Sequence, residues 1–223
     1  MSRLATFAAL LVIVTSQFAH AQVTASSFST GGTARATASG RGNVRLNANA
    51  AAANGGTAIA SMNGSGRYGG RATGSSTAIA NGGYANSRGT SNARGWGARS
   101  NADSFAVTQG GVAISNAGAN ARGWGTANSQ SGAISMGGVA ISNSQANARG
   151  YFGGQGIANS DALTVTNGGW GVSNSRANAN GYFGGQAVSN AGTLNLGGGY
   201  AGATANGTAW GGAAYTDAYH YVP

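Results

Sequence analysis

Residues 147–155 read NARGYFGGQ and residues 178–186 read NANGYFGGQ, so nine residues recur after 31 positions with one substitution, Arg149 to Asn180. Catalytic sites are not usually duplicated in this way, whereas structural building units are. The duplication therefore predicts a repeat architecture, and the surrounding sequence shows what the repeat contains.

A shorter unit, GG-x-x-(Ile/Val)-x-Asn-(Ser/Ala), recurs around this stretch. Its copies begin at Gly137, Gly153, Gly168 and Gly184, so they follow one another at nearly even spacing. Two kinds of unit alternate, one ending in ANARGYF or ANANGYF and the other continuing into DALTVTN or GTLNLGG. The double period is 27 to 31 positions. Degenerate copies such as GGTAIAS at 55–61 extend the pattern upstream.

Each unit has the character of a β-strand. Val139 and Ile141 alternate with Ala140 and Ser142, and Gly-Gly or Asn-Gly bounds the run, as in short strands joined by tight turns. Glycines recur too often for helix. We predict an all-β fold, a short-strand β-solenoid or cross-β-like stack in residues 110–212, with residues 22–109 largely irregular or disordered. The alternative is a low-complexity chain that merely descends from tandem duplication.

Stacked repeats would align like residues. Asn143, Asn159, Asn174 and Asn190 are expected to form hydrogen-bonded ladders. A column of rings is expected on one edge of the stack. Its members are Trp96, Trp124, Tyr151, Phe152, Tyr182, Phe183 and Trp210. We favour the interpretation that these rings pin the turns and fill the one sizeable gap in an Ala/Gly core. The competing interpretation is a sticky stripe that binds sugars or neighbouring chains, assisted by Arg94, Arg122 and Arg149.

The composition argues against an ordinary globular core. The chain has 46 Ala, 42 Gly and 22 Asn among 223 residues, and it has no cysteine. Burying alanine gains far less than burying leucine, and no disulfide compensates. Order must therefore come from cumulative backbone pairing or from assembly with other chains.

Residues 1–21 have the layout of a secretory signal peptide. Arg3 precedes an apolar run from Leu4 to Val14, and Ala19-His20-Ala21 predicts cleavage before Gln22. The run is too short to span a bilayer, and no later window reaches 18 apolar residues, so we expect no membrane partner. The predicted organisation is 1–21 signal peptide, 22–109 Arg-rich degenerate repeats, 110–212 regular repeats and 213–223 Tyr-rich tail.

The mature chain would be strongly basic. Eleven arginines face only Asp103, Asp161 and Asp217, which leaves +8, and nine of the arginines lie between Arg35 and Arg122. Such a charge favours acidic matrix proteins, polysaccharide or a carbonate mineral surface, although it also serves solubility. Nucleic acid is not expected as a partner, because a signal peptide precedes the repeats and the arginines are sparse.

The sequence does not favour an enzyme. It has no Cys, Glu or Lys, and the one histidine after the signal peptide is His220, near the C-terminus, where chains tend to fray. We therefore assign no catalytic, cofactor-binding or metal-binding residues and no cofactor. Asn63 and Asn206 lie in N-glycosylation sequons, and Tyr215, Tyr219 and Tyr221 are candidates for oxidative cross-linking.

Composition over residues 22–223 and motifs such as GGVAISNSQANARG resemble the glycine-, alanine- and asparagine-rich, silk-like organic matrix proteins of mollusc shell. The resemblance implies a secreted structural component of a calcified extracellular matrix that self-associates through repeated strands. Proteins that bind calcium directly are usually acidic, so the arginines indicate a framework protein or a protein that binds acidic partners.

Two other interpretations remain open from the sequence. One is an amyloid-type adhesin or coat fibre subunit. The other is an ice-binding solenoid, which would need ranks of Thr-x-Thr, and Thr164-Val165-Thr166 is nearly alone.

Overall fold

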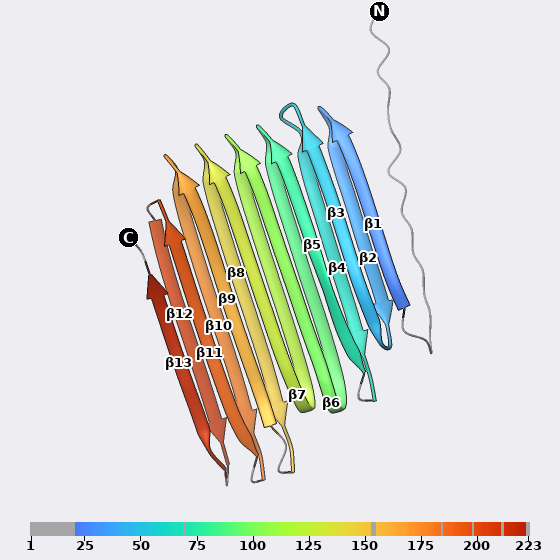
Figure 1. The fold of residues 1–223 in the computed structure, drawn as a ribbon, viewed down its shortest axis with the longest axis vertical. Coiled ribbons are helices and arrows are strands. Elements are labelled where there is room, and N and C mark those ends of the chain that lie inside the picture. The colour runs from blue at the N-terminus through green and yellow to red at the C-terminus, as the bar shows by residue number, and fades with distance from the viewer. Residues whose placement is uncertain are drawn as a thin grey trace, which may run out of the picture.

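The computed structural model describes residues 21–221 apart from 69, 153, 154, 184, 198 and 211. The predicted signal peptide up to residue 20 and the glycine pair 153–154 lie outside the described residues. The described residues form strands joined by short turns (Figure 1). The strands are β1 (Ala21–Thr30), β2 (Thr33–Arg41), β3 (Val44–Ala53), β4 (Thr57–Gly66), β5 (Arg71–Asn81), β6 (Tyr84–Gln109), β7 (Val112–Met136), β8 (Val139–Gly150), β9 (Gln155–Asn167), β10 (Trp170–Gly181), β11 (Gln186–Leu196), β12 (Gly199–Ala209) and β13 (Ala214–Tyr221).

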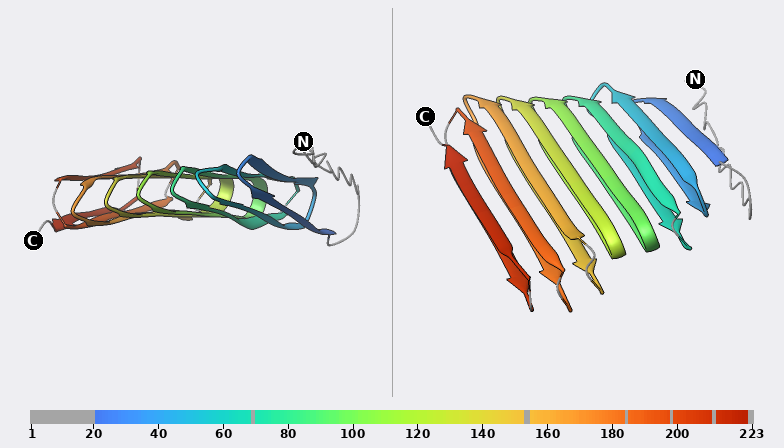
Figure 2. Two further views of the ribbon diagram at one scale, coloured as in Figure 1. Left: turned by 90° about the horizontal axis from the view of Figure 1, so that it is seen from above. Right: turned by 60° about the horizontal axis from the view of Figure 1, so that its bottom comes forward.

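The chain coils into a flattened β-solenoid with two faces. The left view of Figure 2 looks along the strands and shows the two faces as two layers. Face A consists of β1, β3, β5, the second half of β6, the second half of β7, β9, β11 and β13. Face B consists of β2, β4, the first halves of β6 and β7, β8, β10 and β12. Because β6 and β7 each run from face B to face A, hydrogen bonding connects all thirteen strands into one sheet.

The double period in the sequence is one full turn of this coil. Asn116 pairs with Asn143, 27 positions later, and Asn143 pairs with Asn174, 31 positions later. Successive single units therefore lie on opposite faces, which explains why two kinds alternate. The first turn is shorter, since Ala21 pairs with Val44.

The glycine pairs at one edge of the solenoid have a distinct role for each glycine. The first glycine adopts a left-handed conformation, with φ of +73° at Gly110 and +77° at Gly137. The second lies against the turn of the preceding coil: a Cβ at Gly138 would collide with the carbonyl oxygen of Gly111. That carbonyl accepts a hydrogen bond from Val139 N at 3.0 Å, so the backbone ladder continues around the turn. Only glycine satisfies both requirements.

The interior between the two faces is thin, because most of the inward-facing side chains are small. The core consists mainly of alanines, with Leu46 and Met62 among the largest buried side chains. Serines alternate between the faces in a zigzag. Ser131 Oγ donates to the Ser115 carbonyl at 2.8 Å and lies 2.9 Å from Ser115 Oγ, and Ser142 Oγ lies 2.9 Å from Ser131 Oγ. A hydroxyl that reaches the opposite backbone shows that the faces approach more closely than ordinary packed sheets.

The all-β prediction is confirmed, and so is the solenoid. The prediction that residues 22–109 are largely irregular or disordered is borne out only in part, because β1 to β6 give residues 21–109 the same coil as the rest. Sequence reasoning missed this order because those turns vary in length and their apolar rows are interrupted by Arg and Thr. The tail, expected to fray, forms β13 and pairs with β11.

Candidate interaction surface

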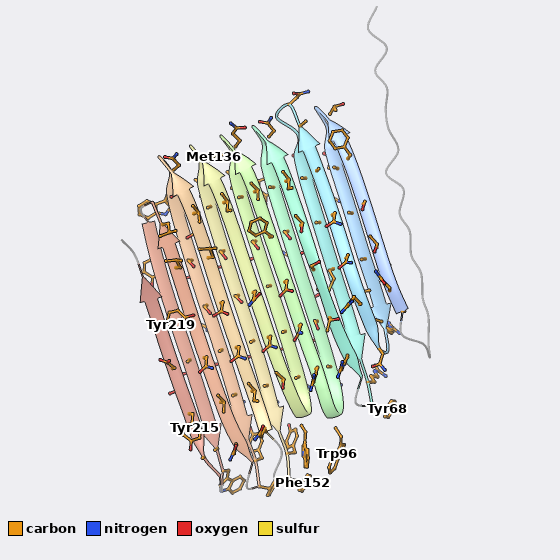
Figure 3. The ribbon with its side chains drawn as sticks, viewed as in Figure 1. Tyr68, Trp96, Met136, Phe152, Tyr215 and Tyr219 are labelled. Carbon is orange, nitrogen blue, oxygen red and sulfur yellow. The ribbon has the colours of Figure 1, made fainter. Side chains whose placement is uncertain are left out.

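Aromatic rings gather at the edge opposite the glycine pairs, as predicted. Trp96 and Trp124 lie 4.7 Å apart between ring centroids, and Phe152 and Phe183 lie 5.3 Å apart and nearly parallel. Phe183 continues to Trp210 at 5.8 Å, and Tyr151 stacks on Tyr182 at 5.4 Å. In Figure 3, Tyr68, Trp96 and Phe152 lie along this aromatic edge, far from Met136 at the other edge.

Five of the seven rings named from the sequence are exposed and do not fill a gap in the core, whereas Tyr151 and Tyr182 are half-buried, so that part of the favoured sequence interpretation is wrong for most of the rings. Tyr68 is 98% exposed, Trp96 71% and Phe152 72%. The interior is already filled by Ala and Ser and has no room for a ring. Trp124 is anchored to the turn of the next coil, since its Nε1 donates to the Tyr151 carbonyl at 2.9 Å.

Three aromatic residues of this edge adopt an unfavourable backbone conformation. Tyr68, Phe152 and Phe183 have φ of 55°, 50° and 54°, a region that bulky residues rarely occupy. Such strain costs on the order of 1–3 kcal/mol and concentrates at functional sites. An exposed ring held at that cost is expected to contact something outside the chain.

Arginines form a second column on face B, next to the aromatic edge. Arg94, Arg122 and Arg149 pair in register across β6, β7 and β8, and all three are exposed. Like charges directly opposite each other on adjacent strands destabilise a sheet. The three aspartates lie on face A, so they do not neutralise this column.

An asparagine ladder runs beside the arginine column, two residues earlier along each strand. Asn120 Nδ2 donates to Asn92 Oδ1 at 3.1 Å, and Asn147 Nδ2 to Asn120 Oδ1 at 2.9 Å. The ladder continues through Asn178 to Asn206. These bonds fix the amides and hold the neighbouring strands in register, which holds the arginines at the strand spacing.

The asparagines singled out in the sequence form hydrogen-bonded ladders, as expected, and these lie one on each face. Asn143 and Asn174 belong to a face B ladder that starts at Asn116. Asn159 and Asn190 belong to a face A ladder that starts at Asn101 and passes through Asn128. The separation follows from successive units lying on opposite faces.

The other side of the aromatic edge is also basic in the N-terminal half. Arg71 and Arg99 pair in register where face A begins, and Arg67 lies just before β5. In contrast, no arginine lies within three residues of the Gly-Gly turns at 82–83, 110–111, 137–138 and 168–169, although Arg35 lies three residues after the turn at 31–32. Positive charge is therefore concentrated along the edge that also exposes the rings.

The acidic residues line a shallow polar groove on face A, together with Tyr219 and asparagines of the ladder. Burial raises the pKa of Asp103. Burial also raises the pKa of Asp161, although hydrogen bonds from Tyr219 and Gln130 act in the opposite direction. The pKa of Tyr219 is raised by the charge of Asp161, by burial, and by the hydrogen bond between Tyr219 and Asp161. The Tyr219 ring lies across Gly192, which leaves space for it to reach Asp161.

The remaining candidates from the sequence have less distinctive surroundings. Among the described residues, no group of three His, Cys, Asp or Glu could hold a metal ion. Within the same residues, no helix has the length and apolar character needed to cross a bilayer. Thr164 and Thr166 point into the interior instead of forming an outward rank. Asn63 is exposed on β4, and Asn206 is the last member of its ladder.

Comparisons of the chain with protein-family models, curated proteins and solved structures found no match.

Proposed function

We propose that this chain is a secreted structural protein of an extracellular matrix, a framework component of a calcified shell matrix that self-associates through its strands. The observation that carries the proposal is the combination of the arginine column and the aromatic edge on a flat, regular solenoid. The solenoid repeats one small unit throughout its described strands. The composition of the chain resembles that of silk-like shell proteins, which supports the same role.

The arginine column provides the contact with acidic partners. Arg94, Arg122 and Arg149 are spaced by the strand separation, about 4.8 Å. A linear polyanion laid across these three coils would meet one guanidinium on each and would relieve their mutual repulsion. Ring edges carry partial positive charge, so the aromatic edge adds to the attraction for carboxylate or carbonate groups.

Binding to acidic polysaccharide and to calcium carbonate tests this role. We expect the triple variant Arg94→Gln, Arg122→Gln, Arg149→Gln to lose most binding in co-sedimentation. The matched triple variant Arg45→Gln, Arg88→Gln, Arg176→Gln removes the same charge from scattered positions and should retain more. Equal loss in both would show that net charge alone acts, and the column would then have no special role.

The tissue distribution of the chain tests the matrix assignment separately. Presence in the insoluble organic fraction of a shell would support it. Abundance only in soluble body fluid would count against it.

An amyloid-type adhesin or coat fibre is the second candidate, and the parallel, in-register asparagine ladders favour it. Tissue of origin separates it from a shell framework better than diffraction does, since both would show the strand spacing. The ice-binding alternative has less support, because Thr164 and Thr166 face inward. A thermal hysteresis assay tests it directly.

A further inference from the structure

Among the described residues, the outermost strands at both ends of the solenoid have one side without a partner strand. β1 and β2 form one end and β12 and β13 the other, and each pairs on one side only (Figure 1). Inward-facing residues confirm that a layer is missing. Ala218 in β13 is exposed, although Ala191, its partner one coil inside, is fully buried. Such edges are templates for the addition of another strand.

The count of strand segments determines how a second copy can fit. Thirteen strands, two of which span both faces, give fifteen segments, eight on face A and seven on face B. The described coil therefore begins on face A with β1 and ends on face A with β13. The next segment needed to continue the coil belongs on face B, where β12 has no outer neighbour among the described residues.

We propose that copies stack head to tail, each turned by about half a turn around the solenoid axis relative to the last. The next copy's β1 then pairs with β12, and its β2 pairs with β13. Strands on the two faces run in opposite directions, so this rotation makes both new pairs parallel, like every pair within the chain. A stack without the rotation would place β1 on β13 and leave a missing strand on face B. The inference rests on the proposed self-association and specifies its geometry.

Charge complements this arrangement. The first strands carry Arg35, Arg41 and Arg45, whereas no arginine follows Arg176 and Asp217 lies on the last strand. Joining two N-terminal ends would oppose arginines to arginines, so the head-to-tail contact is the one that brings unlike charges together.

The alternation of inward and outward residues fixes which side chains meet at the junction. Ala34 and Ala36 of β2 are buried, and Ala218 of β13 lies on the inward side of its strand because its partner Ala191 is buried. A register that pairs Tyr215 with Thr33 of the next copy keeps both inward rows aligned. The same register places Asp217 beside Arg35 on the outside.

Helical reconstruction of filaments formed by the secreted chain tests the geometry. We expect a rotation near half a turn and a rise of about 36 Å for each chain, because fifteen segments occupy two faces at a spacing of about 4.8 Å. Filaments with no rotation between copies, lateral bundles with free end strands, or two-fold symmetric end-to-end dimers would overturn the inference and leave the framework role standing. A chain that remains monomeric at high concentration would overturn both.

Charge-swap variants provide a test independent of imaging. Arg35→Asp and Asp217→Arg should each raise the critical concentration for assembly about three- to ten-fold, since each places like charges at the junction. An equimolar mixture of the two variants should restore assembly, because every junction between one variant and the other joins unlike charges, either as in the unmodified chain or with the two charges reversed. Arg88→Asp, on β6 between β4 and β7 and far from both ends, is the matched control and should assemble like the unmodified chain.

The double variant Arg35→Asp, Asp217→Arg gives the most direct result. Every junction in its filaments carries the reversed pair, so its critical concentration should return close to that of the unmodified chain. A double variant that assembles no better than either single variant would contradict the proposed junction.

Discussion

Gly138 lies so close to Gly111 that the Cβ of an alanine at position 138 would collide with the Gly111 carbonyl oxygen. The collision is with backbone already engaged in the ladder, so a side-chain movement cannot relieve it. We expect Gly138→Ala to lower the free energy of unfolding by about 2–4 kcal/mol, in the range of overpacking and strain combined. Denaturant unfolding measures the loss.

The neighbouring glycine provides the control for this substitution. Gly137 has φ of +77°, but a Cβ added there would meet nothing within 4 Å, so Gly137→Ala meets backbone strain alone. Its cost should be about 1 kcal/mol, clearly below that of Gly138→Ala. Equal costs would show that the close approach between turns is not maintained in solution.

The serine zigzag predicts two different responses at one position. Ser131→Ala removes the hydroxyl that bonds to Ser115 and Ser142, and should cost about 1–2 kcal/mol. Ser131→Leu must fit a large side chain between faces separated by one hydroxyl, and should prevent the native fold. Circular dichroism and denaturant unfolding distinguish the two. A well-folded leucine variant would contradict the thin interior.

Phe152 allows the structural and binding roles of the aromatic edge to be separated. Phe152→Gly relieves the left-handed strain but loses the contact with Phe183 and adds freedom to the unfolded chain. These effects nearly offset, so the free energy of unfolding should change by less than about 1 kcal/mol. Retention on acidic polysaccharide should fall. Large destabilisation with unchanged retention would make the ring a structural element.

The raised pKa values of Asp103 and Asp161 predict how stability depends on pH. An acid whose pKa is higher in the folded chain binds more protons there than in the unfolded chain. Stability should therefore fall as pH rises from the ordinary value of 3.8 through the raised pKa values. The double variant Asp103→Asn, Asp161→Asn should show a flatter dependence. Thermal unfolding between pH 3 and 7 measures this dependence. If the double variant and the unmodified chain lost stability equally over that range, the raised pKa values of the two aspartates would be contradicted.

The regular repeats could be predicted from the sequence because each of their features repeats with a fixed period. The glycine pair at 137–138, the alternation in VAISN and the aromatic turn each mark one part of the coil. The aromatic edge could be predicted because aromatic residues recur at the same place in successive repeats. The N-terminal coils were missed because their copies of the repeat are degenerate, although β4 pairs with β6 in the same parallel manner as the later strands.

Other features depend on which face a residue occupies, and the single-unit period conceals this. Asn143 and Asn159 occupy equivalent positions in successive units but lie on opposite faces. The serine zigzag was also missed, because Ser131 and Ser142 alternate between faces at uneven steps. The outward direction of the rings was not visible either, since an exposed ring in a left-handed turn has the same sequence context as a buried one.

The thin interior also limits how such a protein can change during evolution. A core without volume offers few positions where one bulky residue can compensate for another, so substitutions inside the coil are mostly confined to Ala, Ser and Gly. Inserting or deleting one complete coil preserves the parallel pairing between neighbouring coils, because each coil pairs in the same way with the coils on either side. Length, measured in whole coils, is thus the property of this solenoid that selection can adjust most freely.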